Sequence, residues 1–204
     1  MSEFRSPFPG YNVLDKWNTP SWNEQTRRAV EKRLHDIPER RFFDADEWVT
    51  LEAVCARIVP QPDRPHAPVP IAPWIDQKLF ENRREGYRYA DMPSMPQAWR
   101  LGLCGIDDES RRRFRARFRD LPPERQDDVL RGIQQGDVSG EVWQTLPPRR
   151  FFKSRLLTDI VGVYYAHPAA WNEIGFGGPA SPRGYVRLEF DRRDPWEAAE
   201  RRDD

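Results

Sequence analysis

The sequence predicts a mainly α-helical protein, a single-domain helical bundle with Pro-rich loops and irregular N- and C-terminal arms. Three observations support this fold class. In several segments, apolar side chains recur every three or four residues, which is the spacing of one helix face. The 20 prolines among 204 residues divide the chain into short elements. Outside residues 185–190, no segment alternates between apolar and polar residues as a β-strand does.

Composition suggests three parts. Residues 1–41 are an N-terminal arm and a polar helix, and residues 42–166 are a helical core domain. Residues 167–204 begin with a stretch rich in Gly, Pro and aromatic residues, which is unsuited to a long helix. We expect this last part to be an arm that contacts a partner.

Two capping boxes predict the first helix starts. Ser21 with Glu24 would begin the polar helix, and Asp44 with Glu47 would begin the next helix. The second of these helices carries an apolar stripe typical of a core-facing helix. Cys55 lies in that stripe, so we expect a buried thiol that packs as a small hydrophobic residue.

Prolines and glycines delimit the elements of the core. After a Pro-rich connector, Pro73 is placed to start a short helix. The next helix is expected over residues 97–105, with Cys104 among its buried side chains. Pro122-Pro123 then starts a helix that ends at Gly136. The strongest helical repeat follows over residues 148–166.

An arginine-rich segment lies between these elements. Six of the nine residues in 111–119 are Arg, and the acids Asp107 and Asp108 precede them as expected at a helix start. Helical spacing would place Phe114 and Phe118 on one buried face. The segment is then a solvated helix face that pairs with acids of this chain or another. The alternative is an Arg-rich nucleic-acid-binding or adaptor function, which predicts salt-sensitive binding.

The overall charge excludes some function classes. The 33 basic residues equal the 33 acidic ones and the pI is 6.9, which argues against a dedicated nucleic-acid-binding protein. No apolar run is long enough for direct membrane insertion. Because residues 1–16 lack the apolar part of a secretory signal, we expect a cytoplasmic chain.

No residue pattern predicts chemistry in this chain. The three histidines His35, His66 and His167 are far apart, with His35 and His66 expected at the surface. The glycines of residues 175–178 do not form a dinucleotide fingerprint. Cys55 and Cys104 could form at most one disulfide, and the sequence leaves their pairing open. We therefore expect no catalytic residues, no cofactor-binding residues and no metal ligands.

The C-terminal arm carries the candidate binding residues. Rigid segments with Gly, aromatic residues and Arg favour shape-specific contacts, and Trp, Tyr and Arg dominate interface hot spots. Two alternatives remain: the arm folds back onto its own helices, or it holds an enzymatic site around His167 and Glu173. The candidate partner-binding residues are His167, Trp171, Asn172, Glu173, Phe176, Gly177, Gly178, Arg183, Tyr185 and Trp196.

The same arm carries a family resemblance. The run HPAAWNEIGFGGP at residues 167–179, followed by PRGY at residues 182–185, resembles the C-terminal signature of the gluconate 2-dehydrogenase subunit 3 family. Residues 46–60, 118–126 and 151–165 resemble its first helix, its central Leu-Pro turn and its last long helix. The resemblance covers about residues 42–185.

The resemblance implies a non-catalytic small subunit in a heterodimer. Its partner would be a large FAD-dependent flavoprotein of the glucose-methanol-choline type, which oxidises an alcohol of a sugar or sugar acid. FAD is then expected in the partner and no cofactor in this chain; some family complexes add a cytochrome c subunit. The small subunit would stabilise its partner in a chaperone-like way. Many members begin with a Tat signal that this chain lacks, so periplasmic export would require a Tat-bearing partner.

Overall fold

The computed structural model describes residues 6–83, 89–179 and 189–201, and no strand occurs among them. This confirms the mainly α-helical fold class. The contacts divide the chain into two compact units. One comprises Pro38–Val163, and the other comprises Met1–Ile37 together with Tyr164–Asp204.

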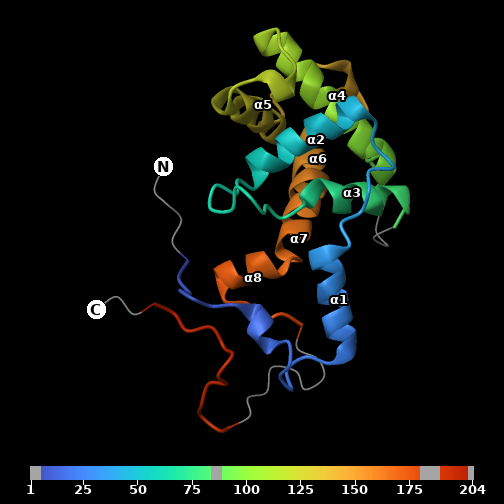
Figure 1. The fold of residues 1–204 in the computed structure, drawn as a ribbon. Helices are drawn as coiled ribbons and strands as arrows, with labels where there is room; N and C mark the ends of the chain where they lie inside the picture. Colours follow the sequence, from blue (N-terminus) through green and yellow to red (C-terminus); the bar gives the residue numbers. More distant parts are fainter. Residues whose placement is uncertain (1–5, 84–88, 180–188, 202–204) are drawn as a thin grey trace. The chain divides into compact units, whose positions relative to one another are not determined.

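The first of these units is built around one long helix. Helix α4 contacts α2, α3 and α5, and Figure 1 shows α4 and α5 at one end of this unit. Its interior contains Trp99, Phe118 and Phe151, none of which is exposed. The elements are α2 (Ala45–Ile58), α3 (Ile71–Phe80), α4 (Met95–Phe114), η2 (Phe118–Asp120), α5 (Pro123–Gln135), η3 (Glu141–Gln144), α6 (Pro148–Phe151), the π-helical turn η4 (Phe152–Leu157) and, up to Val163, α7 (Thr158–Tyr165).

Helix α2 begins where the sequence predicts. The Asp44 carboxylate accepts a hydrogen bond from the Glu47 amide at 2.8 Å, and Glu47 accepts one from the Asp44 amide at 3.0 Å. The helix ends at Ile58, two residues before Pro60. Cys55 is buried, as expected.

Helix α4 differs from the expectation of two separate helices. It continues without a break through Gly105. The Trp143 ring packs so closely there that an ideal Cβ at this position would lie only 2.6 Å from it. The glycine thus permits close packing instead of ending the helix. Cys104 is exposed, not buried, because it lies off the stripe that buries Trp99 and Leu103. Both cysteines are free thiols in the structure.

The arginine-rich segment is not one helix. Helix α4 ends at Phe114, and Arg115 adopts the left-handed conformation with φ of 62°. This turn places Phe118 in η2 instead of on a helix face shared with Phe114, which corrects the predicted alignment. Asp107 lies inside α4 and not at a helix start, and its carboxylate accepts a hydrogen bond from the Phe118 amide at 2.8 Å.

Proline and glycine delimit the following helices as expected. Helix α5 starts at Pro123 and ends before Gly136, whose φ is 74°. The long helical stretch after Pro147 is confirmed, although the sequence does not predict the π-helical turn within it.

The second unit combines both ends of the chain. It contains η1 (Val13–Lys16), α1 (Glu24–His35) and α8 (Pro168–Ile174), with a small core of Val13, Trp22, Val30 and Trp171. Helix α1 is capped by Asn23, whose side chain accepts a hydrogen bond from the Thr26 amide at 2.8 Å. The predicted capping box from Ser21 is therefore wrong. Helix α8 stands where an irregular arm was expected, although its seven residues agree with the expectation that this stretch forms no long helix.

Candidate partner-binding site

Helix α8 and the loop that follows it form the candidate site. His167 caps the helix, and its Nδ1 atom accepts a hydrogen bond from the Ala169 amide at 3.2 Å. Pro168 occupies the first turn, where its missing N–H has no helical partner to lose. Gly175 ends the helix with φ of 64°. A short, well-capped helix therefore replaces the irregular arm at this point.

Trp171 is anchored in the interior of its own unit. Its side chain is only 2% exposed, and its indole Nε1 donates a hydrogen bond to the Tyr165 carbonyl at 2.6 Å. The Arg33 guanidinium lies 5.9 Å from the ring centroid, and the Phe176 ring meets the indole edge-on at 5.7 Å. The buried indole of Trp171 therefore packs against the Phe176 ring and holds it in place.

The N-terminal segment, defined here as residues 6–22, lies against α8 and its loop, as the blue and orange-red ribbons show in Figure 1. The Val13 amide donates to Asn172 Oδ1 at 2.8 Å, and Lys16 Nζ donates to the Gly177 carbonyl at 2.5 Å. The Tyr11 hydroxyl donates to the Phe176 carbonyl at 3.3 Å. The N-terminal segment thereby holds α8 and the loop after it in place through contacts from outside the helix.

Glu173 and His167 have structural contacts. Both carboxylate oxygens of Glu173 accept from the Tyr164 hydroxyl, at 2.7 and 2.8 Å. The Glu173 carbonyl accepts from the Ser6 hydroxyl at 3.3 Å. His167 serves as the N-cap of α8. Through these contacts both residues hold neighbouring parts of the chain in place.

Apolar side chains near these contacts remain exposed. Ile174 is 47% exposed, Phe176 37% and Tyr165 44%. Isolated exposed residues are common, but these three belong to one short stretch of chain that is otherwise well anchored. Ile174 and Tyr165 were not among the sequence candidates, although an Ile beside the helix-ending Gly175 is a local signal of an exposed apolar end.

The remaining candidates differ in position. Gly177 and Gly178 lie in the loop after α8, where an ideal Cβ on Gly178 would lie 3.1 Å from the Trp22 ring. Trp196 is half-buried. Arg183 and Tyr185 lie outside the described residues.

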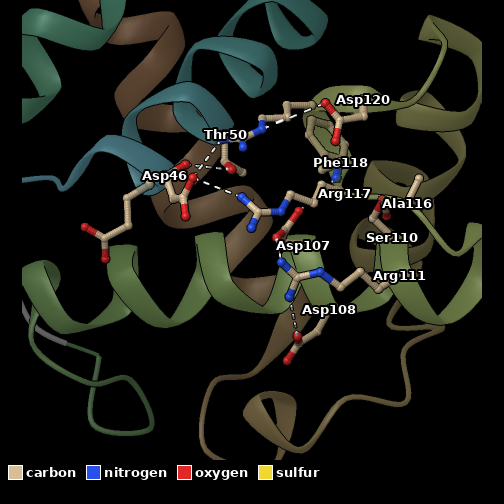
Figure 2. Close-up of polar contacts among 12 residues, drawn as sticks. Asp46, Thr50, Asp107, Asp108, Ser110, Arg111, Ala116, Arg117, Phe118 and Asp120 are labelled. Carbon is tan, nitrogen blue, oxygen red and sulfur yellow. Dashed lines mark hydrogen bonds and ion pairs between the residues drawn. The ribbon is translucent and has the colours of Figure 1, made fainter.

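The arginine-rich segment, residues 111–119, carries the charged groups that the sequence singled out, and Figure 2 shows how some of its side chains are held. Asp46 Oδ1 accepts a hydrogen bond from Arg117 Nη1 at 3.0 Å and another from Arg119 Nη1 at 2.9 Å. The hydrogen bond from Arg119, with the charge of Arg117, holds the pKa of the Asp46 carboxyl below its usual range. Arg111 pairs with Asp107 at 2.7 Å. These pairs favour the solvated, internally paired arginine face.

Within the described ranges, no three His, Cys, Asp or Glu side chains are grouped so that they could hold a metal ion. No helix in the part of the chain that the structure describes is both long and apolar enough to cross a membrane.

The fold and site define a helical protein in which a short helix, α8, leads into a glycine-rich loop. The family model for gluconate 2-dehydrogenase subunit 3 matches residues 45–178, so the chain belongs to this family. The match begins at the first residue of α2 and ends in the loop after α8. No curated protein and no solved structure matches the chain.

Proposed function

We propose that this chain is a non-catalytic small subunit that binds a large FAD-dependent flavoprotein of the glucose-methanol-choline type. The family membership over residues 45–178 carries the proposal, since the family is a small subunit of a dehydrogenase complex. In this proposal the partner holds FAD and oxidises an alcohol of a sugar or sugar acid. A cytochrome c subunit would complete those complexes that pass electrons to a haem.

The proposed contact is made by the C-terminal arm, residues 167–204. Ile174 and Phe176 supply exposed apolar surface, and the buried ring of Trp171 supports Phe176. An aromatic side chain held by its own unit loses little side-chain entropy on binding. Trp171, Asn172 and Glu173 would then contribute by holding the surface, while Phe176, Arg183, Tyr185 and Trp196 would contact the partner.

The proposed consequence for the partner is stabilisation. A subunit that binds only the folded flavoprotein shifts the folding equilibrium toward that state by mass action. Loops of the partner next to the contact would be ordered at the same time, which would shape the substrate entrance. The small subunit would therefore change the stability and the substrate range of the complex without touching the reacting atoms.

Co-purification tests the proposal. The tagged chain is purified from its native cell, and the product is examined by absorbance spectroscopy and by a screen of sugars with an artificial electron acceptor. We expect a yellow two-chain complex with dehydrogenase activity, and a lower melting temperature for the flavoprotein purified alone. A colourless single chain, with a flavoprotein equally stable and active without it, contradicts the proposal.

Phe176→Ala tests the contact itself. We expect about tenfold weaker binding to the flavoprotein, because exposed aromatic anchors at an interface are worth about 1–2 kcal/mol. Phe80→Ala is the matched control, since Phe80 is the same residue type, is 50% exposed and lies in the other unit. Equal losses in both variants, or none in either, place the contact elsewhere.

A further inference from the structure

The N-terminal segment lies outside the family match yet contacts the part of the chain where that match ends. The match begins at residue 45, whereas the segment spans residues 6–22. Its hydrogen bonds reach the carbonyls of Glu173, Phe176 and Gly177 and the side chain of Asn172. Three of these acceptors are backbone atoms, so they hold the path of the chain irrespective of its side chains.

The loop after α8 needs such support. Gly175 and Gly178 both have positive φ, 64° and 71°. Glycine adopts positive and negative φ about equally readily, so the residue type alone does not fix this conformation. The Phe8 ring fills the space beside Gly175, where an ideal Cβ would come within 2.8 Å of its atoms. The N-terminal segment therefore packs closely around a bend that local sequence alone would leave free to fluctuate.

The direction of these contacts separates two roles. A segment that blocked the site would bury the apolar side chains of the loop. Here Ile174 stays 47% exposed and Phe176 37% exposed, while Tyr11 and Lys16 bond to the backbone carbonyls of Phe176 and Gly177. The contacts thus hold the surface in place and leave it accessible.

We infer that residues 6–22 are an intramolecular clamp that preorganises the Ile174–Phe176 surface for the catalytic subunit. The inference rests on the proposed function for the identity of the bound protein, and on geometry for the clamp. Preorganisation raises affinity because the ordering of the loop is completed before binding. When only a fraction of molecules has the competent loop, the apparent affinity falls by that fraction.

The test uses the full chain with the hydrogen bonds removed at two side chains. Lys16→Met removes the ammonium that bonds to the Gly177 carbonyl, and Tyr11→Phe removes only the hydroxyl that bonds to the Phe176 carbonyl. Lys32→Met is the matched control, because Lys32 is an exposed lysine of α1 in the same unit. Tyr11→Phe alone keeps the aromatic ring and serves as the milder variant if the double variant does not fold.

Two measurements are made on each variant. Hydrogen–deuterium exchange of the isolated chain reports on the amides of residues 174–178 without any partner. Titration with the purified flavoprotein reports the affinity. For the double variant we expect exchange about tenfold or more faster in this loop, as the loss of two hydrogen bonds predicts, and binding weakened by a similar factor. Lys32→Met should leave both unchanged.

The outcomes distinguish the clamp from the proposed function. Unchanged exchange in the loop overturns the clamp. Faster exchange with tighter binding also overturns it, because the segment would then be a cover that competes with the partner. Faster exchange in a chain whose unsubstituted form binds no flavoprotein supports the clamp as a device of the fold and overturns the proposed function instead.

Discussion

Substitution of Gly102 by Ala tests the packing of α4. An ideal Cβ at this position would lie 2.5 Å from Phe151 Cε1 and closer still to Cζ, far inside ordinary van der Waals contact. The ring cannot move away freely, because Phe151 is fully buried and lies between Trp99 and Trp143 at centroid distances of 6.1 and 6.2 Å. The methyl group must therefore displace the centre of the core.

The magnitude follows from two opposing effects. Overpacking of a well-filled core costs about 1–3 kcal/mol. Replacing Gly by Ala inside a helix gains about 1 kcal/mol. We expect Gly102→Ala to lower the free energy of unfolding by about 1–2 kcal/mol, with overpacking near the upper end of its range because the clash is with a buried ring.

Gly162 provides the matched control. It also lies within a helix, α7, but an ideal Cβ there meets nothing within 4 Å. Gly162→Ala should therefore stabilise the protein by about 0.5–1 kcal/mol. Thermal and urea unfolding of both variants should show Gly102→Ala melting about 6 °C below Gly162→Ala, at about 2–4 °C per kcal/mol for a chain of this size. Equal stability of the two variants would refute the packing argument.

Two further predictions concern titration and thiol reactivity. Burial, with the charges of Asp15 and Glu197, raises the pKa of Tyr11 to about 12. The contribution of this shifted pKa to stability is present below the unfolded pKa of about 10 and is lost as pH rises from about 10 to 12. Denaturation at stepped pH should show this loss of stability in the unsubstituted chain. The same loss in Tyr11→Phe would disprove its assignment to Tyr11. A thiol reagent should modify Cys104 in the native chain but not Cys55, because burial raises the pKa of the Cys55 thiol and blocks access. Mass spectrometry should find one label per native chain and two after unfolding, and rapid native labelling of Cys55 would contradict its burial.

The candidate site was only partly predictable from sequence. The composition of residues 167–178 singled out the segment, because glycine and aromatic residues have local meaning. The burial of Trp171 depends on Val13, Trp22 and Val30, which are distant in sequence. The involvement of residues 6–22 carries no local signal, since three of the four acceptors that they reach are backbone carbonyls, which every residue possesses.

Local residue types were enough to predict the features that short-range interactions control. These include the start of α2 at the Asp44–Glu47 capping box, the start of α5 at Pro123 and its end at Gly136. Each depends on hydrogen bonds or backbone restrictions within a few residues, so local residue types suffice.

Other features depend on residues that are distant in sequence and became visible only in the folded chain. Helix α4 continues through Gly105 because Trp143 packs against it, although a glycine at that place resembles a helix end. The chain reverses at Arg115 so that Phe118 is buried, and Arg117 and Arg119 reach Asp46. Helical periodicity contains no information on such pairings, because packing and charge pairing over long separations are properties of the folded chain.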